Sequence, residues 1–272
     1  MINGERMFLF RSPALRVAAC VCLIVFVMAS MAIETPAQKN KGSKSKVSKN
    51  KISKKIAPSK RSQAKGKRVS PEVREAEQLL HDLGYWAGPI DGRMDEASRH
   101  ALIAFQKVEG RKRTGRLTAD ELEALRAARR PQPRDKSYAH VEIDLGRQVL
   151  FVVGERGEVK KVLPVSTGNG EEFTNEGWTR RAITPTGRFK VHNKIKGWRK
   201  SPLGMIYYPV YFLSGIAIHG YSSVPVNAAS HGCVRIPLAA AKEFYDEIPT
   251  GMFVIVYNGQ PAAADEDPAS QR

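Results

Sequence analysis

The sequence predicts a multidomain α+β protein, in which a small three-helix module precedes a mainly β domain. Two patterns carry this prediction. Apolar residues recur at helical spacing between residues 70 and 127, and short strand-like apolar segments follow from residue 139. The length of 272 residues and the hydrophobic content of 42% allow one or two compact domains with tails.

The N-terminus is typical of an export signal. Three arginines give it a positive start, and an uncharged, almost wholly apolar run covers residues 17–32. Ser30 and Ala32 fit a small-residue cleavage site, so residues 1–32 are predicted to be a signal peptide of an exported, periplasmic or wall-located protein. The run is shorter than the about 20 apolar residues of a membrane span, and tethering by an uncleaved signal is the alternative.

Residues 33–69 are predicted to be a disordered linker, because Lys, Ser, Ala and Asn dominate and apolar residues are scarce. Residues 39–68 hold eleven Lys, two Arg and no acid, which accounts for +13 of the net charge of +17. Electrostatic contact of this segment with anionic envelope polymers is expected. A nucleic-acid partner is not, because the export signal argues against a cytoplasmic location.

Three helices are predicted within residues 70–128. Ser70 and Pro71 form a typical helix start, a second helix covers about 95–108, and Thr118 caps a third. A linker over 129–137 follows, and a polar tail covers 259–272.

Residues 138–258 are predicted to form the mainly β domain, with one late helix opening at Pro237. The expected strands are 141–145, 149–153, 159–166, 189–192, 207–212, 215–218 and 252–257.

Cysteine usage singles out one thiol. Cys20 and Cys22 lie inside the predicted signal, so cleavage would leave Cys233 as the only cysteine of the mature chain. Such a thiol is either a small buried hydrophobe or a reactive group, and its neighbours decide between the two.

Histidines and glycines surround Cys233. Thiol acyl transfer needs a base for the thiol proton and backbone N–H groups for the oxyanion. His219 is the better base candidate, because it ends an apolar strand and Gly220 lets the chain turn away. His231 and Arg235 would share a face with Cys233 on an extended backbone, and Arg235 could bind a carboxylate.

A zinc site is the main rival interpretation, with His219, His231 and Cys233 as three ligands. The segment lacks a His-Glu-x-x-His helix and an obvious carboxylate base, so neither a metal nor another cofactor is predicted.

Two stretches resemble known families. The helical stretch is similar to the peptidoglycan-binding domain type 1 family, through Gln78-x-Leu80-x-x-Leu83-Gly84-Tyr85, Gly88-x-Ile90-Asp91-Gly92 and Thr114-Gly115-x-Leu117-Thr118. The later domain resembles the L,D-transpeptidase catalytic (YkuD) family, through His219-Gly220, Ser230-His231-Gly232-Cys233-Val234-Arg235 and Thr184-Pro185-Thr186-Gly187. This resemblance implies a β-sandwich-like fold.

The resemblance also implies a reaction. Cys233 would attack the bond between the third and fourth residues of a peptidoglycan stem tetrapeptide, and a second stem would accept the acyl group in a 3→3 crosslink. His219 would be the base, oriented by the carbonyl of Gly220. The N–H groups near His231, Gly232 and Cys233 would form the oxyanion hole, and Ser230 and Arg235 would hold the loop and the substrate.

Four alternatives remain open on the sequence. Water as acceptor would make an L,D-carboxypeptidase, and a protein lysine would make a protein-to-peptidoglycan attachment enzyme. A zinc amidase and a non-catalytic wall-binding protein belong to other classes. A polar insert over residues 170–181 is a candidate lid or substrate wall.

Overall fold

The computed structural model describes residues 69–259. The predicted signal, the basic segment up to Arg68 and the tail beyond Gly259 lie outside the described residues. Among residues 69–259, no helix has the length and apolar character that a membrane crossing needs.

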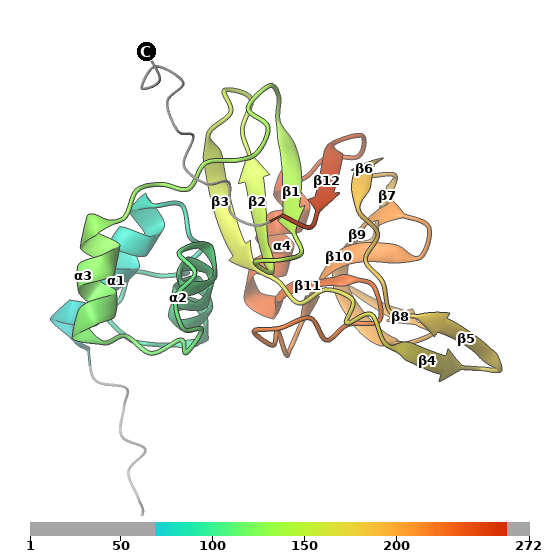
Figure 1. Cartoon of the computed structure of the whole chain (residues 1–272), viewed down its shortest axis with the longest axis horizontal. Helices are drawn as coiled ribbons and strands as arrows, with labels where there is room; N and C mark the ends of the chain where they lie inside the picture. Colours follow the sequence, from blue (N-terminus) through green and yellow to red (C-terminus); the bar gives the residue numbers. More distant parts are fainter. Residues whose placement is uncertain (1–68, 260–272) are drawn as a thin grey trace, which may run out of the picture. The chain divides into compact units, whose positions relative to one another are not determined.

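The three predicted helices are confirmed, and each begins at a side-chain cap. The caps are Ser70, Asp95 and Thr118, whose side-chain oxygens accept the N–H of the residue three positions later. The helices are α1 (Pro71–Asp82), α2 (Glu96–Val108) and α3 (Ala119–Ala127), drawn in cyan to green in Figure 1.

The β domain contains two five-stranded sheets and a separate hairpin. The first sheet has the order β3-β2-β1-β12-β6, with β1 parallel to β12. Its strands are β1 (His140–Asp144), β2 (Val149–Val153), β3 (Val159–Pro164), β6 (Gly187–Lys190) and β12 (Phe253–Tyr257).

The second sheet carries the candidate site. Its order is β11-β10-β9-β7, β8 also pairs with β9, and β10 runs parallel to β11. The strands are β7 (Asn193–Lys194), β8 (Trp198–Ser201), β9 (Gly204–Leu213), β10 (Ile216–Tyr221) and β11 (Val234–Pro237). The separate hairpin pairs β4 (Glu172–Asn175) with β5 (Trp178–Arg181), and Figure 1 shows it projecting from the β domain.

Both sheets share one apolar core, which α4 (Ala241–Glu247) closes. Ile143 and Val256 of the first sheet, Val210 and Ile218 of the second, and Phe244 of α4 belong to it. The predicted late helix begins with a short 3₁₀ turn, η1 (Leu238–Ala240), and becomes α-helical only at Ala241.

Strand β2 is buried on both faces. Leu150 and Val152 lie in the core of the two sheets, whereas Phe151 and its neighbours pack with Leu102 and Phe105 of α2 in a second core. This explains why Val149–Val153 is apolar throughout instead of alternating.

Candidate active site

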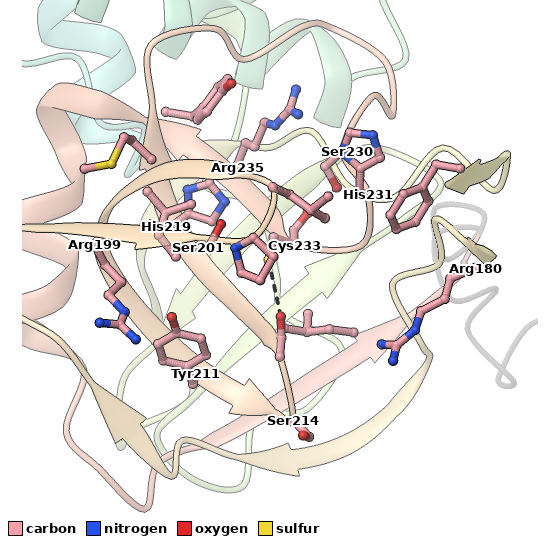
Figure 2. Close-up of a pocket in the computed structure, with 18 of the residues that line it drawn as sticks. Arg180, Arg199, Ser201, Tyr211, Ser214, His219, Ser230, His231, Cys233 and Arg235 are labelled. Atoms are coloured by element: carbon pink, nitrogen blue, oxygen red, sulfur yellow. Dashed lines mark hydrogen bonds between the residues drawn. The ribbon is translucent and has the colours of Figure 1, made fainter. Parts of the chain in front are cut away.

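The nucleophile candidate and the base candidate lie on neighbouring parallel strands. Cys233 directly precedes β11, and the register pairs His219 of β10 with Arg235 of β11. Because side chains alternate along a strand, this register places Cys233 and Arg235 on the same face as His219. All three line one pocket (Figure 2).

His219 is held as one neutral tautomer. Its ring is buried, and Nδ1 donates to the carbonyl of Gly220 at 3.0 Å. A carbonyl only accepts, so Nδ1 carries the proton and Nε2 is left as the acceptor. Burial lowers the pKa of His219 to about 4, aided by the positive charge of Arg235 and opposed by the Gly220 hydrogen bond. The imidazole is therefore an unprotonated base at neutral pH.

The thiol of Cys233 is also neutral at rest. Burial raises the pKa of Cys233 above its ordinary value, against the opposing effects of a hydrogen bond from the Ala217 backbone and the charge of Arg235. Its Sγ lies 3.8 Å from the carbonyl oxygen of Gly215. A neutral thiol and a neutral imidazole that line one pocket form a pair in which proton transfer can accompany attack on a substrate.

The strand geometry corrects one expectation about His219. The strand does not end at Ile218, and Gly220 does not turn the chain: β10 continues to Tyr221, with Gly220 paired to Ile236. Gly220 is needed for packing instead, since an added Cβ would lie 2.6 Å from the Cβ of Ala241. The expected contact between the Gly220 carbonyl and the imidazole is present.

Ser230 and Gly232 fix the loop before Cys233. The buried Ser230 hydroxyl donates to the Cys233 carbonyl and accepts the Gly232 N–H at 3.1 Å. Gly232 has φ +128°, a region that favours glycine, and a Cβ there would lie 2.9 Å from the carbonyl oxygen of Ile183. Thr184 donates to the Gly232 carbonyl at 2.7 Å.

The three N–H groups expected to form the oxyanion hole differ in whether they are already hydrogen-bonded. The N–H of Gly232 is already bonded to Ser230, so it is not a free donor in this state. Within the described part of the chain, no hydrogen bond uses the N–H of His231 or Cys233. These two N–H groups remain the candidate oxyanion donors.

His231 lines the same pocket as Cys233 and packs against the hairpin wall of that pocket. It is exposed, and its ring centroid lies 4.6 Å from that of Phe173 on β4. Gly232, with φ +128°, bends the chain between His231 and Cys233, so these two residues do not lie on one extended strand. The zinc interpretation needs three converging ligands, and no such group of His, Cys, Asp or Glu is found among residues 69–259.

The pocket over Cys233 is strongly cationic. It has a volume of about 380 Å³, and two hairpins form much of its wall: β4–β5 and β8–β9. Among the described residues, no Asp or Glu lines it, whereas five cationic side chains do: Arg180, Arg181, Arg199, Lys200 and Arg235. Figure 2 shows Arg180 and Arg199 on either side of Cys233. The site therefore suits a substrate with carboxylates.

The sequence predicted only part of the pocket wall. The polar insert over 170–181 is the β4–β5 hairpin, and its Phe173, Trp178 and Arg180 line the pocket. Arg199 and Lys200 of β8 were missed, because β8 is short and exposed and shows no apolar periodicity. The only local signal nearby is the Pro202-Leu203-Gly204 sequence, which is typical of a turn and does not by itself indicate a strand.

Comparisons with known proteins agree with this geometry. Residues 138–256 match the family model of the L,D-transpeptidase catalytic domain, YkuD, and residues 69–125 match that of a peptidoglycan binding domain. The crystal structure of the L,D-transpeptidase from Xylanimonas cellulosilytica is similar, with 42% identity and a TM-score of 0.66. That match covers 70% of this chain and 94% of the other.

Two more distant structures are also similar. The L,D-transpeptidase from Stackebrandtia nassauensis is 22% identical, with a TM-score of 0.41, over 71% of this chain and 94% of the other. The L,D-transpeptidase from Mycobacterium smegmatis is 21% identical, with a TM-score of 0.36, over 44% and 58%. No curated protein sequence matches the chain. The family models and the 42% identical structure together assign the chain to the L,D-transpeptidase family.

Proposed function

We propose that this chain is an exported L,D-transpeptidase that forms 3→3 crosslinks between peptidoglycan stem peptides through a Cys233 acyl-enzyme. The observation that carries the proposal is the placement of Cys233 and His219 on one face of neighbouring parallel strands, with the imidazole fixed by Gly220. The family assignment and the cationic pocket support it.

The proposed acylation step begins at Cys233. The sulfur attacks the carbonyl carbon between the third and fourth residues of the donor stem, while the thiol proton passes to Nε2 of His219. The N–H groups of His231 and Cys233 would stabilise the oxyanion. The C–N bond then breaks, the imidazolium returns its proton to the leaving amine of D-Ala, and a thioester remains.

The proposed deacylation step reverses these roles. A side-chain amine of the third residue of a second stem attacks the thioester and gives one proton to His219. The C–S bond breaks, the sulfur leaves as thiolate, and it takes back the proton from the imidazolium. An amide crosslink and free Cys233 result.

The basic segment over residues 39–68 would assist from outside the described structure. Its charge suits anionic envelope polymers, which would hold the enzyme near its substrate once residues 1–32 have directed export.

Intact-protein mass spectrometry tests the acyl-enzyme. Protein lacking residues 1–32 is mixed with a disaccharide tetrapeptide and, separately, with a carbapenem. We expect one covalent adduct on the wild type, none on Cys233→Ala and slower formation on His219→Ala. His81→Ala serves as the matched control, because His81 is an exposed histidine of α1. The released products separate crosslinking from hydrolysis, and no adduct on folded, reduced protein with either reagent would refute the proposal.

A further inference from the structure

A lysine of the helical module is buried without an acidic partner. Lys107 lies near the end of α2, its side chain is 1% exposed, and Nζ donates to the carbonyls of Gln148 and Val165 at 2.9 Å each. Among residues 69–259 no carboxylate forms an ion pair with it. Both acceptors belong to the β domain, so this side chain joins the two modules.

Burying this amine is costly. Burial, together with the positive charge of Arg113, lowers the pKa of Lys107 to about 7. An apolar side chain of similar shape would fill the space without that cost. The hydrogen bonds to the two carbonyls are therefore the best explanation for a lysine at this position.

The first carbonyl belongs to a residue with every polar group in use. Gln148 has φ +61°, and its carbonyl also accepts the N–H of Val165 at 2.9 Å. Its side-chain amide donates to the Thr167 hydroxyl at 2.7 Å and accepts the Thr167 N–H at 2.9 Å. Lys107 thus holds both Gln148 and the segment that leads to Thr167.

Thr167 passes this constraint to residues 226–233, the segment before β11 that we call the catalytic loop. Its carbonyl accepts the N–H groups of Ala229 and Ser230, at 3.0 and 2.9 Å. Ser230 in turn donates to the carbonyl of Cys233. An unbroken series of hydrogen bonds therefore connects Lys107 to the residue that carries the nucleophile.

A second cation of the module reaches the same loop. The Arg113 guanidinium donates to the carbonyl of Val226 at 3.2 Å, three residues before Ala229. Lys107 therefore binds the segment that pairs with the catalytic loop, and Arg113 binds the start of the loop itself.

We propose that the helical module is a positioning element of the active site, in which Lys107 and Arg113 hold the catalytic loop through the carbonyls of Gln148, Val165 and Val226. Lys107 touches no substrate, so it is a positioning residue. The proposal rests on the proposed function of Cys233. It gives the module a role that does not depend on binding the cell wall.

The test uses acylation by soluble reagents, which removes wall binding from the measurement. Lys107→Met, Arg113→Gln and the exposed control Lys112→Met are made in protein lacking residues 1–32. Folding is checked by circular dichroism at the assay temperature. We expect Lys107→Met to lower the acylation rate constant about tenfold with KM unchanged, since small displacements of reacting groups cost this much. Arg113→Gln should lower it about threefold, and Lys112→Met should leave it unchanged.

A double mutant tests the route. Thr167→Val removes the hydroxyl that Gln148 holds, so its effect and that of Lys107→Met should be less than additive if both act through one series of bonds. Wild-type rates in folded Lys107→Met, or a loss seen only on intact cell walls, would overturn the proposal. If Lys107→Met does not fold, a wild-type rate in Arg113→Gln overturns it. Failure of the wild type to acylate would instead refute the function proposed for Cys233.

Discussion

The catalytic loop and the β4–β5 hairpin face the same pocket but are held very differently. In the loop, Ser230 and Gly232 are fixed by hydrogen bonds to buried neighbours. In the hairpin, residues Glu172–Asn175 and Trp178–Arg181 are exposed or half-buried, and the ring of Phe173 packs against that of His231. The comparison indicates that the reacting groups are held rigidly, whereas the wall that meets the substrate is free to vary.

Glycine substitutions give the largest expected difference between the two regions. Gly232→Ala would place a Cβ 2.9 Å from the Ile183 carbonyl oxygen, next to the nucleophile. We expect acylation to fall by about 100-fold, because the loop must shift. Gly177→Ala also has positive φ, at +84°, but a Cβ there meets nothing within 4 Å. Adduct formation measured for both should fall only in Gly232→Ala, and equal losses would break the comparison.

The pH dependence of acylation tests whether the His219 ring is shielded from water. Burial and Arg235 lower the pKa of His219 to about 4, so the base stays unprotonated down to that pH. We expect the acylation rate to fall about tenfold per pH unit only below about 4. An inflection near 6.5 would show instead that the imidazole is solvated.

The same pKa shift makes the stability of the fold depend on pH. The unfolded chain binds a proton at His219 near pH 6.5, which the folded protein resists until about pH 4. The folded state should therefore lose stability as the pH falls from about 6.5 to about 4. In His219→Gln this contribution should disappear from thermal unfolding curves.

Charge removal in the pocket wall gives the smallest expected effect. Arg180→Gln and Arg199→Gln should each raise the KM for a tetrapeptide donor about two- to threefold at low salt, because exposed charges act through screened fields. The rate of acylation at saturation should not change. Arg116→Gln, an exposed arginine outside the pocket, is the control. Equal KM values for all four proteins at low salt would show that the wall does not attract carboxylates.

The sequence predicted correctly those elements whose structure depends on neighbouring residues in the chain. The caps at Ser70 and Thr118 and the wholly apolar Val149–Val153 are local signals, and the structure confirms the elements they predicted. The motif singled out Cys233 as the nucleophile candidate and His219 as the base candidate. The structure places both in one pocket.

Other features depend on partners far away in the chain. The strands β7, β8 and β11 are short and gain their pairing from β9 and β10, so no local pattern marks them. Gly220 was interpreted as a turn because its packing partner, Ala241, lies in a later element. Lys107 resembles any lysine at the end of a helix, and only the fold places it beside Gln148 and Val165.

Strand β2 has a consequence for how the protein unfolds. Its two faces belong to different cores, one of which includes α2. Detaching the helices would expose Phe151 and its neighbours to water, which is unfavourable in proportion to the apolar area uncovered. The helical module and the catalytic domain are therefore expected to melt as one cooperative unit, with the amides of β2 among the slowest to exchange.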